Sequence, residues 1–225
     1  MKYAILIPAY NAERTLPELI DELLMLPVLP VKIVVVDDGS VDNTAGVAAI
    51  DQRVLVKTLH KNQGKGSALK AGFDLILQHY NVEYILCMDA DLQHPASSVP
   101  DFLAGAADGK SRFVIGNRLK KPGVMPVHRI LSNSITSWLI SRVTGQEIKD
   151  SQCGYRLVHR DVVTGLALHE NGFQLESEMI IRAAQTGYRI DFIDIPTIYY
   201  ANSSHISNLQ DTMRFIRLIF REFIR

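Results

Sequence analysis

Five short apolar runs, each followed by residues typical of turns, constrain the fold of this chain most strongly. They are rich in β-branched residues and lie at Tyr3–Ile7, Ile33–Val36, Val54–Val56, Tyr84–Met88 and Phe113–Ile115. Such runs are typical of strands that are buried on both faces. Segments with a helical pattern separate them, at Glu13–Leu26, Thr44–Ile50, Gly66–His79 and Ser98–Ala107. This alternation predicts an α/β fold in which helices cover both faces of a mainly parallel sheet.

The second half of the chain is less regular, and we expect it to wrap one edge of that sheet. Met125–Val143 and Phe173–Thr186 have helical patterns. Ser151–Leu157 is predicted to be a loop or a strand, and Ile190–Tyr200 a strand-like run that breaks at Pro196.

Composition excludes several classes of protein. The 225 residues are 47% hydrophobic, which suits a packed core and is too apolar for intrinsic disorder. The 24 Lys and Arg balance 24 Asp and Glu, which argues against a nucleic-acid partner bound through bulk positive charge. No stretch approaches the roughly 18 uncharged apolar residues of a membrane span, and the N-terminal run is too short for a signal peptide. The two cysteines form neither a disulfide framework nor a zinc motif, so we expect a reducing compartment.

Polar residues follow the strands at the edge where parallel sheets bind ligands. These segments are Pro8–Asn11, Asp37–Ser40, Asp89–Asp91 and Gly116–Arg118. Alternate residues of an extended segment point the same way, so Asp89 and Asp91 could share a divalent cation, with Gln93 close by. The alternative is that the two aspartates only begin a turn or cap the next helix. In either case the sequence predicts a binding site at this edge.

Two further segments at this edge also have two interpretations. Asp37 and Asp38 either build an Asp-Gly turn or accept hydrogen bonds from a base or ribose, and we favour binding. Asn62–Ser67 precedes a helix, so its backbone amides and Lys65 could meet phosphate. This segment lacks the complete dinucleotide and Walker patterns, and close packing of its glycines explains it equally well.

Isolated residues have simple structural interpretations. Glu176 opens a helix, where a carboxylate is stabilised by the helix dipole. His94 is expected at the surface, Trp138 in the core or an interface, and Cys87 in the interior.

In combination and in order, these motifs resemble those of family 2 glycosyltransferases with the GT-A fold. The segments that match are Pro8–Asn11, Val36–Ser40, Asn62–Gly66, Asp89–Asp91 and Gly116–Arg118. Asp150–Arg156 and Phe173–Glu176 extend the resemblance toward the branch that includes dolichol-phosphate mannosyltransferase. It implies a UDP- or GDP-linked sugar donor, Mg²⁺ or Mn²⁺ as cofactor, and inversion at the anomeric carbon. We predict one GT-A domain over residues 1–225, with a nucleotide-sugar and metal half at 1–120, an acceptor half at 121–208 and a basic helix at 209–225.

The resemblance also implies roles for individual residues. Those implied to bind the nucleotide sugar are Pro8, Tyr10, Glu13, Asp38, Lys65, Asp89 and Ala90. Those implied to bind the metal are Asp89, Asp91, Gln93 and His205. Those implied to act on the reacting groups are Arg118, Arg129, Asp150 and Glu176, the last as general base. Ala12 replaces a glutamate common in that branch, and Tyr200–His205 replaces its usual loop, which weakens an assignment to mannose from a guanosine nucleotide.

The basic segment Leu209–Arg225 bears on the prediction of the acceptor, because it carries arginines and apolar residues at helical spacing. Such a helix either lies in a membrane interface or packs on its own domain. We expect a polyprenyl phosphate acceptor and a cytoplasmic protein at the inner face of the cell membrane. The alternatives are a hydroxyl of a saccharide or glycolipid in cell-envelope glycan synthesis, and a noncatalytic nucleotide-sugar-binding protein. A hydroxyl must lose its proton, whereas a phosphate is already anionic, so Glu176 should matter much more for a hydroxyl.

Overall fold

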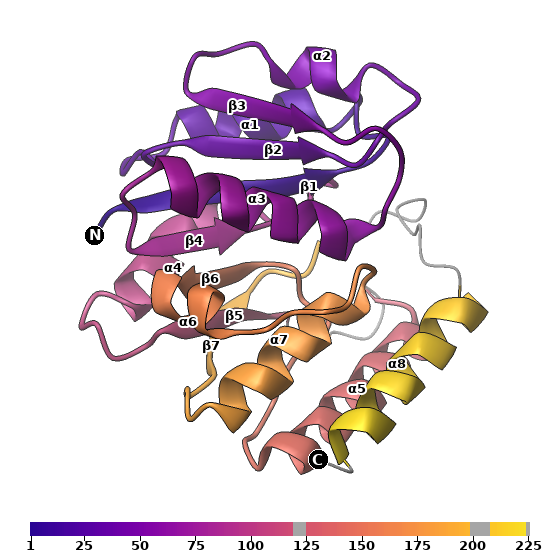
Figure 1. The fold of residues 1–225 in the computed structure, drawn as a ribbon. Helices are drawn as coiled ribbons and strands as arrows, with labels where there is room; N and C mark the ends of the chain where they lie inside the picture. The colour runs from indigo at the N-terminus through magenta and orange to yellow at the C-terminus, as the bar shows by residue number, and fades with distance from the viewer. Residues whose placement is uncertain (119–124, 199–207, 224–225) are drawn as a thin grey trace.

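The computed structural model describes residues 1–118, 125–198 and 208–223, which are built around one seven-stranded sheet (Figure 1). The strands are β1 (Tyr3–Ala9), β2 (Ile33–Asp37), β3 (Val54–Thr58), β4 (Tyr84–Cys87), β5 (Phe113–Arg118), β6 (Arg156–His159) and β7 (Asp191–Ile195). Their order is β3-β2-β1-β4-β6-β5-β7, and β6 runs antiparallel to β4 and β5. The other neighbours pair in parallel. The α/β class and the five predicted strands are confirmed.

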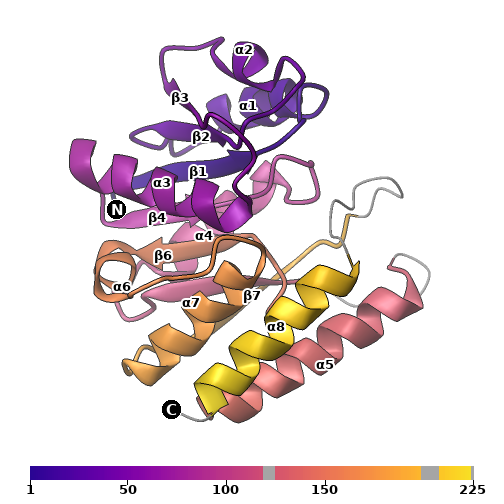
Figure 2. The same cartoon turned by 45° about the vertical axis from the view of Figure 1, so that its right-hand side comes forward.

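Helices lie on both faces of this sheet, with α3 and α7 on one face and α1 on the other (Figures 1 and 2). The helices are α1 (Leu16–Leu24), α2 (Thr44–Ala48), α3 (Lys65–His79), α4 (Val99–Gly105), α5 (Val127–Thr144), α6 (Arg160–Gly165), α7 (Gln174–Gln185) and α8 (Asn208–Phe223). A short 3₁₀ helix, Ala96–Ser98, precedes α4. Within the described ranges, no helix combines the length and apolar character that crossing a bilayer requires.

The apolar pattern of the sequence explains these elements. Four neighbouring residues of β1, Ala4–Ile7, are fully buried, as expected for a central strand covered on both faces. In α1 the buried side chains are Leu16, Leu19, Ile20 and Leu23. Their spacing of three and four residues places them on one face of the helix, which packs into the core.

The second half of the chain enters the sheet, so the prediction that it only wraps one edge is wrong. β6 lies between β4 and β5, and only β7 lies at the edge. Leu157 and Val158 of β6 are fully buried in this position. A four-residue strand after a polar loop gives little periodic signal, which explains why β6 and the six-residue α6 were difficult to predict.

Candidate active site

A cavity of about 930 Å³ collects the side chains that follow the strands. The predicted site residues that line it are Pro8, Tyr10, Glu13, Asp38, Lys65, Asp89, Ala90, Asp91, Gln93, Arg118, Arg129 and Glu176. Phe173 and Arg214, which sequence reasoning did not select, also line it. Asp150 is not among the lining residues, and His205 lies outside the described residues. The structure thus brings segments from both halves of the chain to one place.

The centre of this cavity is a cluster of charged groups around Lys65. The Lys65 ammonium lies 2.5 Å from Oδ1 of Asp89 and 3.1 Å from Oε1 of Glu176. The Phe173 ring centroid lies 5.8 Å from the same nitrogen. Burial alone would lower the pKa of Lys65, but the charges of Asp89 and Glu176 outweigh it and raise that pKa. Lys65 is therefore a cation at physiological pH, held between the end of β4 and the first turn of α7.

The two aspartates after β4 differ in their electrostatic surroundings. Burial favours a raised pKa for Asp89, but the Lys65 ammonium outweighs it and lowers that pKa. For Asp91, burial and then the charge of Asp89 raise the pKa. Leu92 has a φ of 61°, an uncommon conformation for this residue type, and the backbone N–H of Gln93 donates to Oδ1 of Asp91 at 3.1 Å. Asp91 therefore begins a turn and also contributes negative charge to the cavity.

This donor set fits a hard divalent cation that takes its remaining ligands from water or phosphate. Asp89 and Asp91 supply carboxylates and Gln93 an amide. Among the residues that the structure describes, no group of three or more His, Cys, Asp or Glu side chains could enclose a metal ion. Mg²⁺ and Mn²⁺ commonly bind through one or two carboxylates together with substrate phosphates. These residues could hold such an ion once a diphosphate is present.

His94 and Gly154 hold Asp89 in position. The prediction of a surface position for His94 is wrong, because the side chain is 3% exposed and stacks on the ring of Tyr155. Its Nδ1 accepts the backbone N–H of Asp89 at 3.1 Å, and burial lowers its pKa to about 4. A Cβ added at Gly154 would lie 2.6 Å from Oδ2 of Asp89. The neutral imidazole thus holds the backbone of Asp89, and the missing side chain at Gly154 leaves room for the Asp89 carboxylate.

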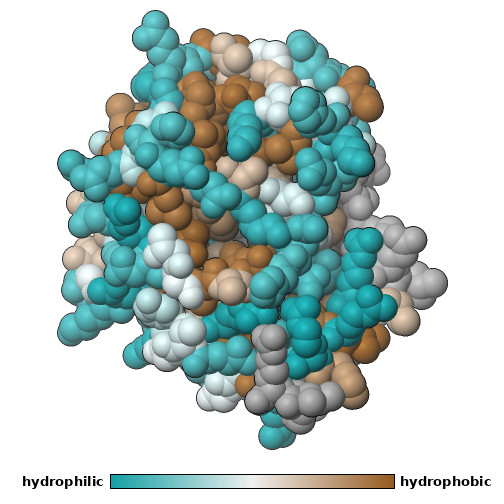
Figure 3. Space-filling view, viewed as in Figure 1, coloured by the Kyte–Doolittle hydropathy of each residue, from teal (hydrophilic) through white to brown (hydrophobic). Residues whose placement is uncertain are grey.

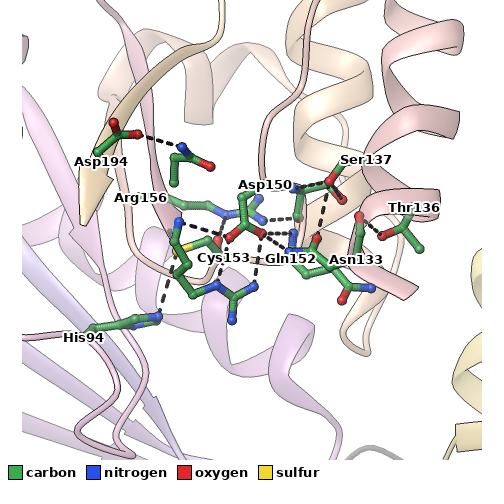
Figure 4. Close-up of polar contacts among 12 residues, drawn as sticks. His94, Asn133, Thr136, Ser137, Asp150, Gln152, Cys153, Arg156 and Asp194 are labelled. Carbon is green, nitrogen blue, oxygen red and sulfur yellow. Dashed lines mark hydrogen bonds and ion pairs between the residues drawn. The ribbon is translucent and has the colours of Figure 1, made fainter. Parts of the chain in front are cut away.

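Asp150 acts through Arg118 and does not line the cavity. Nε and Nη2 of Arg118 donate to the two oxygens of Asp150 at 2.8 and 3.0 Å. Nδ2 of Asn133 also donates to Asp150, at 2.9 Å (Figure 4). Burial favours a raised pKa for this carboxyl, but Arg118 and Asn133 lower it. Asp150 is fully buried and holds the Arg118 guanidinium, and its implied catalytic role stays a prediction.

Arg156 is a supporting residue that the sequence did not reveal. It is 1% exposed and donates to the backbone carbonyls of Ser151, Cys153 and Glu176 at 2.8, 2.7 and 2.6 Å. These bonds join the loop before β6 to the first turn of α7, and Figure 4 shows the part around Cys153. Arg156 thereby fixes the backbone that carries Glu176. A single arginine in a polar segment gave no signal for this role.

Asp38, which also lines the cavity, organises the loop before α3. Its two oxygens accept the backbone N–H groups of Gln63 and Gly64, each at 2.8 Å. Gly64 has a φ of 98°, and an added Cβ would lie 2.5 Å from the carbonyl oxygen of Asn171. The interpretation of these glycines as close-packing residues is confirmed. Binding of phosphate by this loop stays a prediction.

Two further acidic residues near the ends of β1 and β2, Glu13 and Asp37, already have hydrogen-bond partners within the chain. Oδ1 of Asp37 accepts the backbone N–H of Ser40 at 3.0 Å and its hydroxyl at 2.5 Å, and Asp37 does not line the cavity. The turn interpretation therefore holds for Asp37. Oε2 of Glu13 accepts the backbone N–H of Asn43 at 2.9 Å, so Glu13 lines the cavity and also fixes the start of α2.

Comparison with known proteins identifies the family of this chain. Residues 4–166 match the family described as glycosyl transferase family 2. The undecaprenyl-phosphate 4-deoxy-4-formamido-L-arabinose transferase of Shewanella sediminis is 33% identical over 176 residues, which are 74% of this chain. The dolichol-phosphate mannosyltransferase of Pyrococcus furiosus is 30% identical over 232 residues, which cover 98% of this chain. The chain spans 51% of the length of the first relative and 63% of the second.

A solved structure shows the same fold. It is glucosyl-3-phosphoglycerate synthase from Mycobacterium tuberculosis in complex with Mn²⁺, UDP and glucosyl-3-phosphoglycerate. The TM-score is 0.72 at 19% sequence identity, over 99% of this chain and 78% of that chain. This likeness confirms the predicted GT-A fold. Since the family match alone spans more than half of the sequence, the chain belongs to glycosyl transferase family 2.

Proposed function

We propose that this chain transfers a sugar from a UDP- or GDP-linked donor to a polyprenyl phosphate, with inversion at the anomeric carbon. The observation that carries the proposal is one cavity lined by two aspartates suited to a cation and by arginines from β5 and α5. The polyprenyl phosphates in the names of the two relatives support this class of acceptor. The Mn²⁺ and UDP in the neighbouring structure support the donor and the cofactor.

The donor half of the cavity is proposed to bind the nucleotide. Pro8, Tyr10, Glu13 and Asp38 would line the base and ribose, and Ala90 would contact the donor beside the cation. Asp89, Asp91 and Gln93 would hold Mg²⁺ or Mn²⁺, which neutralises charge on the departing diphosphate. Lys65 and Arg118 add positive charge in the same cavity, where a preorganised cation stabilises the leaving group without reorganisation.

The acceptor half favours an anionic nucleophile. Arg118, Arg129 and Arg214 line the cavity, and arginine suits phosphate recognition because its donors form a rigid fork. The family resemblance implies that Glu176 is the general base, but in the structure its Oε1 forms an ion pair with the Lys65 ammonium. A phosphate monoester carries its negative charge near neutral pH and needs orientation by arginine rather than a base. This pairing favours the phosphate acceptor over the hydroxyl alternative.

A lipid acceptor also suggests where the protein works. We propose a peripheral position at the inner face of the cell membrane, with α8 in the interface. α8 packs on α5 and α7, while Met213, Ile216 and Phe220 are exposed. The two interpretations of the basic helix are therefore compatible, since one side packs on the domain and the other is available to lipid.

A transfer assay tests the function. Radiolabelled UDP- and GDP-sugars are incubated with Mn²⁺ and either a short polyprenyl phosphate or the corresponding polyprenol. We expect labelled product with the phosphate only, and none with Asp91→Asn. Product with the polyprenol would instead establish the hydroxyl acceptor. Nucleotide binding without product from any acceptor would establish a noncatalytic protein.

A further inference from the structure

Helix α5 buries polar side chains and exposes apolar ones. Its three buried residues are Asn133, Ser137 and Ile140, and the first two are 2% and 3% exposed. Trp138, which was expected in the core or an interface, is 57% exposed, and this excludes the core. Apolar side chains also lie at the surface where Figure 1 places the neighbouring helix α8, as Figure 3 shows. Apolar packing therefore does not explain the burial of Asn133 and Ser137, because a buried polar group costs free energy unless it is hydrogen-bonded.

Asn133 and Ser137 are hydrogen-bonded to the loop that precedes β6. Nδ2 of Asn133 donates to Oδ1 of Asp150 at 2.9 Å, and its amide oxygen accepts the Ser137 hydroxyl at 3.3 Å (Figure 4). Oγ of Ser137 in turn accepts the backbone N–H of Ser151 at 3.0 Å. Because an ionised carboxylate only accepts hydrogen bonds, the nitrogen end of the amide must face Asp150. Ser137 thereby holds the Asn133 amide in the orientation that donates to Asp150.

The orientation of the Asp150 carboxylate determines that of the Arg118 guanidinium. Oδ1 of Asp150 accepts the Asn133 amide at 2.9 Å and the backbone N–H of Gln152 at 3.2 Å, so two donors hold this oxygen. Nε and Nη2 of Arg118 then meet Oδ2 and Oδ1 in a two-point pair. Nη1 has no role in this pair and can meet a phosphate in the cavity that Arg118 lines. Asn133 is not among the lining residues, so its route to a ligand there runs through Asp150 and Arg118.

We propose that Asn133 is a positioning residue for sugar transfer, which acts through Asp150 and holds Arg118 in the orientation that meets the diphosphate of the donor. Ser137, Asn133 and Asp150 are each at most 3% exposed. Water therefore does not readily replace a donor that is lost from this network. The alternative is a structural role, in which the network only joins α5 to the domain. The contact with the diphosphate rests on the proposed function, whereas the orientation of Arg118 does not.

Nuclear magnetic resonance of the intact chain with ¹⁵N-labelled arginine tests this orientation without any substrate. The Nε–H signal of Arg118 is identified by its loss in Arg118→Lys. We expect this hydrogen to exchange with water about tenfold faster in Asn133→Leu, which has a side chain of similar shape that cannot donate. Thr136→Val is the matched control, because the Thr136 hydroxyl donates to backbone carbonyls within α5. Circular dichroism checks that the variants fold, and Asn133→Ala replaces the leucine variant if that variant does not.

A rate assay then separates positioning from a structural role. Asn133→Leu should lower kcat about tenfold and leave the KM of the acceptor nearly unchanged, because Arg118 is present but less well oriented. In the Arg118→Lys background, the same substitution should cause no further loss of kcat. A structural role would instead lower kcat by the same factor in both backgrounds.

Two results would overturn the proposal. One is an exchange rate of the Arg118 Nε–H in Asn133→Leu that equals the rate in Thr136→Val. The other is an equal loss of kcat in the wild-type and Arg118→Lys backgrounds. If the wild type transfers no sugar to any acceptor, the proposed function fails, and the exchange measurement still decides whether Asn133 orients Arg118.

Discussion

Replacing Lys65 with methionine removes the cation between Asp89 and Glu176 while keeping much of the side-chain volume. Removing one partner of a buried ion pair costs about 3–5 kcal/mol, because the remaining charge is left uncompensated. The carboxylates of Asp89 and Glu176 are 27% and 9% exposed, so solvent screens part of this charge and we expect a cost of about 3 kcal/mol. For a chain of this size, roughly 2–4 °C of melting temperature corresponds to 1 kcal/mol. The predicted decrease for Lys65→Met is therefore about 6–12 °C.

The same variant tests whether Asp89 belongs to a cation site. In Lys65→Met the Asp89 carboxylate loses its internal cation, so added Mn²⁺ should raise the melting temperature of the variant more than that of the wild type. Thermal unfolding with and without Mn²⁺ measures both effects. Lys70→Met, a more exposed change in the same helix, is the control and should shift the melting temperature by no more than about 2 °C. Equal Mn²⁺ shifts in variant and wild type, or a decrease as small as that of the control, would refute the reasoning.

Three further predictions concern neighbouring residues. Burial lowers the pKa of His94 from 6.5 to about 4, so between these pH values only the unfolded chain takes up the proton. The free energy of unfolding should therefore fall by on the order of 3 kcal/mol as the pH drops through that interval. His94→Asn, which cannot take up the proton, should flatten this dependence in urea unfolding at several pH values. Gly154→Ala should destabilise the protein by about 1–3 kcal/mol and abolish the increase of its melting temperature by Mn²⁺, because the added Cβ would displace the Asp89 carboxylate. An unchanged free energy of unfolding would contradict this. Glu176→Gln should slow transfer to a phosphate acceptor by less than about tenfold in a rate assay, whereas a loss of about 10²–10⁴-fold would identify a general base.

The sequence alone predicts the sheet because its strands follow a strong physical rule. β1, β2 and β4 are buried on both faces, so their runs are continuously apolar and bounded by turn residues. The position of the candidate site follows as well. In a mainly parallel sheet, residues after neighbouring strands must meet at one edge, and Asp38, Asp89 and Arg118 do line one cavity.

Contacts between side chains from distant segments could not be predicted in the same way. Lys65, Asp89 and Glu176 belong to α3, the loop after β4 and α7, and helical or strand periodicity indicates a face but not a partner. His94 was expected at the surface because an isolated histidine most often lies there. Its burial depends on stacking against Tyr155, which lies 61 positions later.

The central claim is that Asp91 helps to bind a cation and a nucleotide sugar in one cavity. Thermal unfolding with UDP, GDP and their sugar conjugates, with and without Mn²⁺, tests it on the wild type and Asp91→Asn. A ligand at about 100 times its dissociation constant stabilises by roughly 2.7 kcal/mol, which is readily measured. Because burial and then the charge of Asp89 raise the pKa of Asp91, the variant should be at least as stable as the wild type without ligand. We predict that one nucleotide raises the melting temperature of the wild type only when Mn²⁺ is present, and that Asp91→Asn loses this increase. No increase with any nucleotide, or the same increase in the variant, would contradict the account.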